Sequence, residues 1–181
     1  MLPGDQVAVS EEFVAGRGTY EQEGKIYASY PGIVDLNENE KVARVKGFNP
    51  PVQVERGEVI FARVTDIKSS LLICEIFKVE GKERKVVGGE VEGTLHVSKM
   101  SEQYTEDIRD HYRVGDILRG RVLQTEPSIQ LTTADKRFGV ALGLCTQCRK
   151  PMELRGRELF CVQDDRAERR KIVVDYGNLE L

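Results

Sequence analysis

Three cysteines and one aspartate near the C-terminus have the residue types and spacing of a metal site. Cys145 and Cys148 form a Cys-x-x-Cys pair, and Cys161 is followed three residues later by Asp164. Two such pairs on neighbouring turns can bind opposite sides of one Zn²⁺ ion. A carboxylate has the negative charge of a thiolate but is a harder ligand, which zinc still accepts. The spacing therefore predicts one zinc ion per chain, bound by Cys145, Cys148, Cys161 and Asp164.

The fourth ligand has competitors, namely Asp165, a water molecule or a vacant position. All four positions of the expected set belong to the protein, so no position is left for a substrate and the site is predicted to be structural. The elements that must position it are small: strand, turn at Gly156 and strand, with a third strand in KIVVDYG after a charged connection. So small a unit cannot bury enough apolar surface to fold without a staple. The alternative to zinc is a metal-free segment stabilised by packing against a partner.

The whole chain has the composition of a protein built from short strands and turns. Its 181 residues are 40% hydrophobic and 31% charged, with 17 glycines and no tryptophan. This favours an all-β protein of two or three small domains. The net charge of −3 argues against a strong global basic field, so any binding of nucleic acid must be local or helped by partners. Catalytic motifs are lacking, with two histidines and no phosphate-binding loop, and we expect no enzyme.

The cellular location follows from the N-terminus and the cysteines. The first residues, MLPGDQVAVSEE, are not a basic segment followed by an apolar one, and no stretch approaches the roughly 18 apolar residues that span a bilayer. We expect a cytoplasmic protein with no membrane partner. In a reducing compartment, Cys-x-x-Cys spacing indicates metal rather than a disulfide. Cys74, inside the apolar run LLICEI, is expected to be a buried strand residue.

Clusters of Gly, Pro and polar residues divide the chain into four segments. Residues 1–51 contain short strands and end at the turn NPP, which predicts a small N-terminal β domain. Residues 52–135 have the order strand, strand, strand, short helix after Ser101, strand, strand, which is typical of a five-stranded OB-type barrel. Residues 136–144 are expected to be a linker with one helical turn. Residues 145–181 form the small metal-stapled domain.

The second segment resembles an S1 RNA-binding domain. GEVEGTLHVSKM and YRVGDILRGRVLQTEPSIQLTT resemble the second half of that domain, and GEVIFARVTD matches its first strand. The resemblance implies an RNA-facing surface of basic residues and a histidine, which stack on bases or bind phosphates. Carried over by position, these residues are Arg63, Lys68, His96, Lys99, Arg119 and Arg121.

This sequence departs from the S1 pattern on the second strand. Many S1 domains have Phe-Gly-x-Phe where this chain has IKSSLL, so the aromatic platform is absent. Stacking worth about 1–3 kcal/mol per base is lost, which weakens autonomous RNA binding. His96 has the alternative of a partly buried strand residue held by packing. Arg119 and Arg121, on one side of their strand by alternation, have the alternative of a solvated face.

Taken together, an N-terminal β domain, an S1 domain and a C-terminal zinc ribbon resemble the cap subunit of the archaeal RNA exosome. The opening run, with its glycine turns and YEQEG, is similar to that family's N-terminal domain. The resemblance implies a non-catalytic subunit, three copies of which dock through the N-terminal domain on a hexameric ring of phosphorolytic ribonuclease-like subunits. Their S1 domains would surround the pore and guide RNA to it, and the ribbon would face further partners, including a primase-like protein.

Two functions from other classes stay open. Both S1 folds and zinc ribbons occur in stand-alone RNA-binding factors of translation or transcription, and fold alone does not separate these from a cap. A nuclease is the third hypothesis. Its acidic candidates, Glu102, Glu106, Asp107 and Asp110, have helix-like spacing, which is more typical of a solvated face than of a two-metal site.

Overall fold

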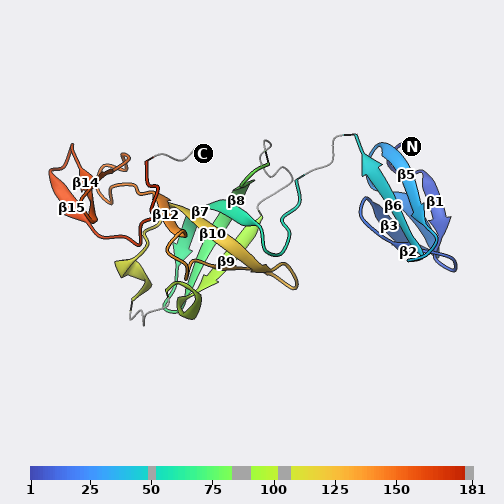
Figure 1. Ribbon diagram of the computed structural model, residues 1–181, viewed down its shortest axis with the longest axis horizontal. Helices are drawn as coiled ribbons and strands as arrows, with labels where there is room; N and C mark the ends of the chain where they lie inside the picture. Colours follow the sequence, from blue (N-terminus) through green and yellow to red (C-terminus); the bar gives the residue numbers. More distant parts are fainter. Residues whose placement is uncertain (49–51, 83–90, 102–106, 178–181) are drawn as a thin grey trace. The chain divides into compact units, whose positions relative to one another are not determined.

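Two compact units make up the computed structural model, which describes residues 1–48, 52–82, 91–101 and 107–177 (Figure 1). They comprise Met1–Pro51 and Val52–Leu181. Regular structure in the described residues consists of strands and two short 3₁₀ turns, with no α-helix, which confirms the all-β prediction. The turn expected at residues 49–51 and the acids Glu102 and Glu106 lie outside the described residues.

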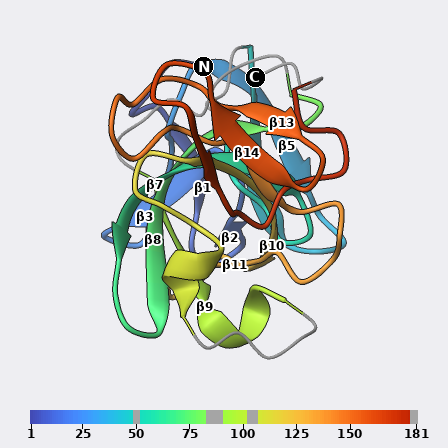
Figure 2. The ribbon, with the colours of Figure 1, turned by 90° about the vertical axis from the view of Figure 1, so that its left-hand side faces the viewer.

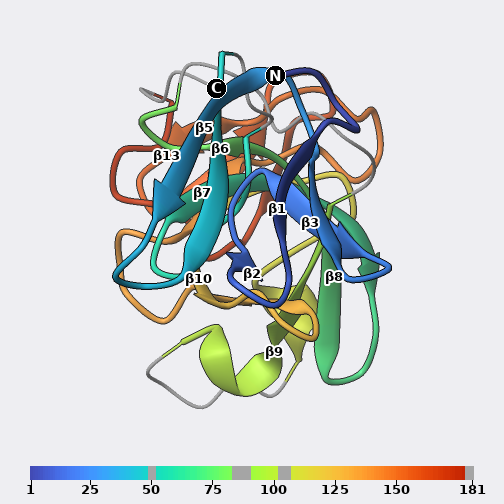
Figure 3. The ribbon, with the colours of Figure 1, turned by 90° about the vertical axis from the view of Figure 1, so that its right-hand side faces the viewer.

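The first unit consists of two three-stranded sheets, seen in blue in Figure 3. Short strands suit the sequence, because a glycine or polar turn interrupts it every few residues. Gly18 shows how tight the packing is: its φ is +82°, and a Cβ there would lie 2.4 Å from the Val45 carbonyl oxygen. The sheets are β1 (Gln6–Val9), β4 (Lys25–Ala28) and β3 (Thr19–Gln22), and β2 (Val14–Ala15), β6 (Val42–Gly47) and β5 (Gly32–Asn37).

A closed five-stranded barrel forms most of the second unit. The strand order is β11-β9-β8-β7-β10, and pairing of β10 with β11 closes it. Two 3₁₀ turns, η1 (Val97–Lys99) and η2 (Ile108–Asp110), occupy the described part of the connection where a short helix is expected. The predicted barrel order is confirmed. Its strands are β7 (Val59–Ile67), β8 (Leu71–Val79), β9 (Glu92–His96), β10 (Ile117–Gln124) and β11 (Ile129–Thr132).

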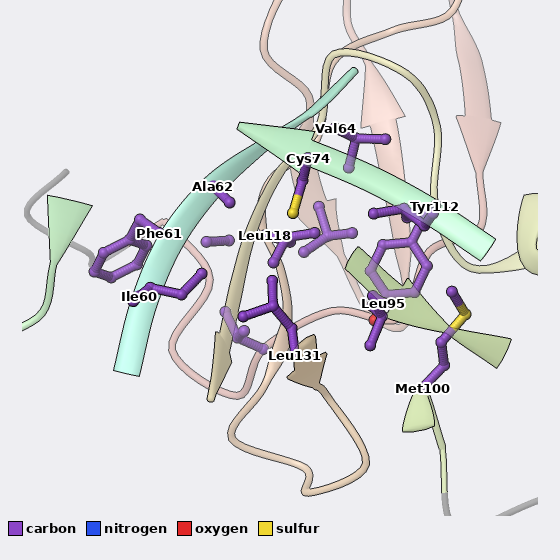
Figure 4. Packing of buried hydrophobic residues seen from close by; sticks show 14 of the residues in the cluster. Ile60, Phe61, Ala62, Val64, Cys74, Leu95, Met100, Tyr112, Leu118 and Leu131 are labelled. Carbon is purple, nitrogen blue, oxygen red and sulfur yellow. The ribbon is translucent and has the colours of Figure 1, made fainter. Parts of the chain in front are cut away.

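Alternate residues of β8 and β10 point into the barrel and build its core (Figure 4). Burial of a large aliphatic side chain stabilises the fold by about 1.5–3 kcal/mol, and many such side chains meet here. Cys74 is fully buried among them, as expected for a strand residue. The hydroxyls of Tyr112 and Thr133 are also buried, and their oxygens lie 2.7 Å apart, so the polar groups in this core are paired.

The prediction of a linker at 136–144 is wrong for four of its residues, which form the strand β12 (Gly139–Leu142). This strand pairs with the first half of β10, with Arg119 opposite Gly139. The physical reason is burial, because Val140 and Ala141 pack in the same core as the barrel. The barrel sheet is thus extended to six strands along this edge.

The C-terminal part is a three-stranded sheet of β13 (Glu153–Arg155), β14 (Glu158–Cys161) and β15 (Arg166–Glu168). The hairpin at Gly156, where φ is +66°, is confirmed. The third strand differs from the expectation, because it is β15 in the supposed charged connection and not residues 171–177. Ile172 instead forms a parallel bridge with Val140, which ties this segment to β12. Figure 2 shows β13 and β14 in red and orange.

Candidate metal centre and candidate RNA-binding surface

Four side chains of the C-terminal part converge on one point. Cys145 and Cys148 lie in the turn before β13, Cys161 ends β14, and Asp164 lies in the turn before β15. Their ligand atoms all lie within 4.8 Å of one another. Asp164 Oδ2 is 3.1 Å from Cys145 Sγ and 3.6 Å from Cys161 Sγ, and the Sγ atoms of Cys148 and Cys161 are 3.5 Å apart.

Two of these three separations, 3.5 and 3.6 Å, match those around a tetrahedral zinc ion, and the third, 3.1 Å, is shorter. Bonds of about 2.3 Å to sulfur and about 2.1 Å to oxygen place the ligand atoms roughly 3.5–3.8 Å apart. Asp165 is not a member of the cluster. Its own backbone, at φ +47°, helps to form the turn that places Asp164. Three cysteines and an aspartate are therefore placed closely enough to hold a metal ion.

Hydrogen bonds within this cluster shift the pKa values of its members. Hydrogen bonds from the thiols of Cys148 and Cys145 lower the pKa of Asp164, and the same bond to Asp164 is the main cause that raises the pKa of Cys148 to about 12. A cation that replaces the thiol protons would satisfy the carboxylate and the sulfurs together, because metal binding to thiols releases protons. The donor set is thus suited to a divalent ion with a preference for sulfur.

A buried ionic chain connects this cluster to the barrel. Glu168 Oε1 accepts hydrogen bonds from the backbone N–H and the hydroxyl of Thr146, at 3.2 and 2.7 Å, between the first two cysteines. Arg170 donates to Glu168 at 2.6 Å and to Asp116 at 2.8 Å, and Asp116 accepts from the Leu144 N–H. The side chains of Arg170 and Asp116 are completely buried. Such outer partners orient metal ligands.

The pKa values within this chain follow from burial and pairing. Burial raises the pKa of Asp116, and Arg170 opposes it. For Glu168, burial also acts to raise the pKa, but hydrogen bonds from Thr146 and Arg170 outweigh it and the pKa is lowered. Sequence reasoning missed the Asp116–Arg170–Glu168 chain. The only signal was the Val-Gly-Asp run that precedes β10, which marked Asp116 without naming its partner.

Three of the expected RNA-binding residues are exposed near one corner of the barrel. His96 ends β9 opposite Leu71, and the Lys68 N–H donates to the Leu71 carbonyl at 2.8 Å. Lys99 follows on η1, and all three side chains are exposed. The His96 ring is held by Ser98, whose hydroxyl lies 2.9 Å from Nδ1. Arg63 is exposed on β7, opposite Glu75.

Arg119 and Arg121 lie in a different environment from these four. Arg119 forms ion pairs with Glu80 and, at 3.0 Å, with Asp175, and its side chain is 16% exposed. The Arg121 guanidinium lies 5.4 Å from the centre of the Phe138 ring. The structure therefore uses both arginines to pack the segments that follow the barrel against β10. Their contact with RNA stays a prediction, as it does for the other four residues.

Comparison with known proteins connects the chain to exosome components. Residues 1–37 match the family described as the exosome complex exonuclease RRP4 N-terminal region. The exosome complex component Csl4 of Archaeoglobus fulgidus is 33% identical, and the match covers 99% of this chain and 98% of that protein. Human exosome complex component CSL4 is 24% identical, and the match covers 94% of this chain and 91% of the human protein. Exosome complex component Rrp4 of Methanobrevibacter smithii is 30% identical over 47% of this chain and 31% of its own.

Two further observations concern membrane-spanning helices and solved structures. Within the described residues, no helix is both long and apolar enough to cross a bilayer. The α subunit of aIF2 from Pyrococcus abyssi matches 54% of this chain and 32% of its own, with 22% identity and a TM-score of 0.38. A similarity this low supports no inference about function.

Proposed function

This chain belongs to the Csl4 family of exosome complex components, and on that premise we propose that it is a non-catalytic, RNA-binding cap subunit of an exosome. The observation that carries the proposal is the 33% identity to a Csl4 protein along almost the whole of both chains. It would recruit RNA and guide it into a hexameric phosphorolytic ring that degrades and processes RNA from the 3′ end. Three copies would occupy one ring.

Docking on the ring would use the first unit. The family match covers residues 1–37 of this unit. Several of its large apolar side chains are exposed, a property of surfaces that bind other proteins. The most exposed are Phe48, Leu2, Val14 and Ile33, at 72%, 67%, 64% and 63%.

RNA binding would use Arg63, Lys68, His96 and Lys99, which are exposed on the barrel, together with Arg119 and Arg121 on β10. Each copy would bind weakly, because the chain has a net charge of −3 and lacks an aromatic platform. Three weak sites around one pore gain effective concentration that one copy lacks. Weak individual binding therefore suits a subunit that passes RNA onward.

The C-terminal part would hold one structural zinc ion through Cys145, Cys148, Cys161 and Asp164. When bound, the ion staples a sheet that is too small to be stable alone. A further partner such as a primase-like protein would contact exposed apolar side chains of this part, such as Val162 and Val174, which are 60% and 74% exposed. Cysteines without disulfide partners suit the cytoplasm, where we place the protein.

The test measures RNA affinity of the full chain at two salt concentrations, alone and with a hexameric exosome ring. We expect weak, salt-dependent binding alone, and tight RNA capture with a larger co-eluting complex when the ring is present. Ile33→Asp should abolish co-elution, whereas Leu154→Asp, a matched change on the C-terminal sheet, should not. Tight binding alone without ring association would overturn the proposal in favour of a stand-alone factor, and RNA cleavage by the chain would indicate a nuclease.

A further inference from the structure

An arginine-lined cavity lies where the barrel meets the cysteine-rich turn. Its volume is about 340 Å³, and Arg109, Arg113 and Arg149 contribute to its walls. Arg109 comes from η2, Arg113 from the segment before β10, and Arg149 directly follows the metal-site residue Cys148. We call these three residues the arginine pocket. Sequence reasoning assigned none of them to a site.

Backbone carbonyls hold the three guanidinium groups in place. Arg149 Nη1 donates to the Val114 carbonyl at 2.8 Å, Arg113 Nη1 to the Tyr112 carbonyl at 3.0 Å, and Arg109 Nη2 to the Ile67 carbonyl at 3.5 Å. A guanidinium has five N–H donors, so these bonds fix its direction and leave most donors for another group. A ligand would therefore meet preoriented donors.

No carboxylate neutralises the pocket by an ion pair within the part of the chain that the structure describes. Asp66 is the single acid in its walls, and Asp66 Oδ1 accepts from the Ile67 N–H at 2.8 Å. Burial, and then the charge of Arg170, lower the pKa of Arg113, while the charges of Glu168, Asp116 and Asp110 act in the opposite direction. Six other arginines of the same unit do form ion pairs, namely Arg119, Arg137, Arg155, Arg166, Arg169 and Arg170.

Arg149 also adopts a backbone conformation that favours glycine. Its φ is +62°, a left-handed value that costs a residue with a side chain of the order of 1 kcal/mol or more. The chain nevertheless has arginine at this position, and its guanidinium reaches the barrel at Val114. Arg149 thus keeps an unfavourable backbone conformation, and its positively charged side chain lies in the wall of the pocket.

We propose that the arginine pocket binds a phosphate group of the RNA backbone, at a site distinct from Arg63, Lys68, His96 and Lys99. Arginine donors suit phosphate, whose oxygens accept hydrogen bonds from several sides, whereas a carboxylate has two oxygens in one plane. The pocket adjoins the open surface, because Ile67 lines the cavity and the exposed Lys68 follows it in the chain. An RNA strand that contacts Lys68 would continue into the pocket and toward the cysteine-rich turn. This inference rests on the proposed RNA-binding function.

The experiment compares RNA binding of the double variant Arg109→Ala/Arg149→Gly with that of Arg109→Ala/Arg157→Gly. Both lose two positive charges, but exposed Arg157 lies in the β13–β14 turn, outside the pocket. Glycine at 149 relieves the left-handed backbone, so the first variant should fold. We expect its affinity for single-stranded RNA to fall roughly three- to tenfold further than that of the second variant. Its log–log salt slope should be shallower than that of the second variant by about 0.7, because it binds one phosphate fewer.

Ring association and a phosphate titration separate the possible outcomes. Equal RNA affinity and equal salt slope of the two double variants would overturn the pocket proposal, even if both still co-elute with the ring and capture RNA. If the unmodified chain fails to join the ring, the cap function fails, and the comparison on the chain alone still tests the pocket. Inorganic phosphate is then added to the unmodified chain at constant ionic strength, at phosphate concentrations that leave RNA bound. It should not shift the resonance of the Arg149 side-chain N–H groups. A shift there, with equal RNA affinity of the variants, would assign the pocket to free phosphate.

Discussion

Replacement of Arg170 by alanine should destabilise the second unit by about 3–5 kcal/mol at neutral pH. Arg170 is completely buried and joins Asp116 to Glu168 at 2.8 and 2.6 Å. Its removal leaves the buried Asp116 carboxylate without a counter-charge, and loss of one partner from a buried pair typically costs this much. Hydrogen exchange measured by mass spectrometry resolves the two units. Amides of β10 and β12 should exchange faster by about two to four orders of magnitude.

The loss of stability in Arg170→Ala should also depend on pH, in a direction that follows from the pKa of Asp116. Burial raises the pKa of Asp116 above its unfolded value, and Arg170 opposes that rise, so Arg170→Ala raises the folded pKa further. A group with a raised folded pKa stabilises the fold below its unfolded pKa, and this contribution disappears as the pH rises through the folded pKa. The deficit of the variant should therefore shrink as the pH falls from neutral through the raised pKa of Asp116, because protonated Asp116 no longer requires a cation.

Two controls make the result decisive. Arg169→Ala removes the neighbouring arginine, whose side chain is 85% exposed and pairs with Glu158, and exchange of β10 should not change measurably. Asp116→Asn/Arg170→Met should be less destabilised than the sum of its single variants, because no buried carboxylate at position 116 is then left without its cation. Additive effects in this cycle, or a deficit of Arg170→Ala that is independent of pH, would refute the reasoning.

Three further experiments test other parts of the structure. Native mass spectrometry should show one zinc per chain, and Asp164→Ala should weaken its retention more than Asp165→Ala; equal retention would remove Asp164 from the site. Gly139→Ala should cost about 1–3 kcal/mol, because the added Cβ would lie 2.3 Å from the Lys171 carbonyl oxygen; unchanged thermal unfolding would contradict this close approach. Cys74, whose pKa burial raises to about 12, should resist alkylation in the native chain, while the other three cysteines react after chelation; rapid labelling of Cys74 would show that the barrel opens.

Local patterns predicted much of this fold because they act over a few residues. Cysteine spacing marked the metal cluster, and Gly156 marked the hairpin inside it. The apolar run around Cys74 predicted correctly that this residue is buried. Each of these signals is complete within one strand or one turn, so no distant residue needs to be known.

The errors involve contacts between distant segments. Strand alternation places Arg119 and Arg121 on one side of β10, but it does not reveal that Phe138 and Asp175 meet them there. The run from Gly139 to Leu142 is too short to distinguish a strand from a linker, and its partner β10 decides the outcome. The arginine pocket was missed for the same reason, since its walls come from three separate segments.

The bridge between Val140 and Ile172 has a consequence for motion and for evolution. Because the chain leaves the barrel at β12 and returns beside it, the intervening residues are an insertion whose two ends lie together. Such an insertion is attached both through β12 and through the bridge at Ile172, and it cannot rotate about a single peptide as a tethered domain would. Insertions with adjacent ends are also readily exchanged for others without disturbing their host. Relatives could thus acquire a different outer module while the barrel and its route for RNA stay the same.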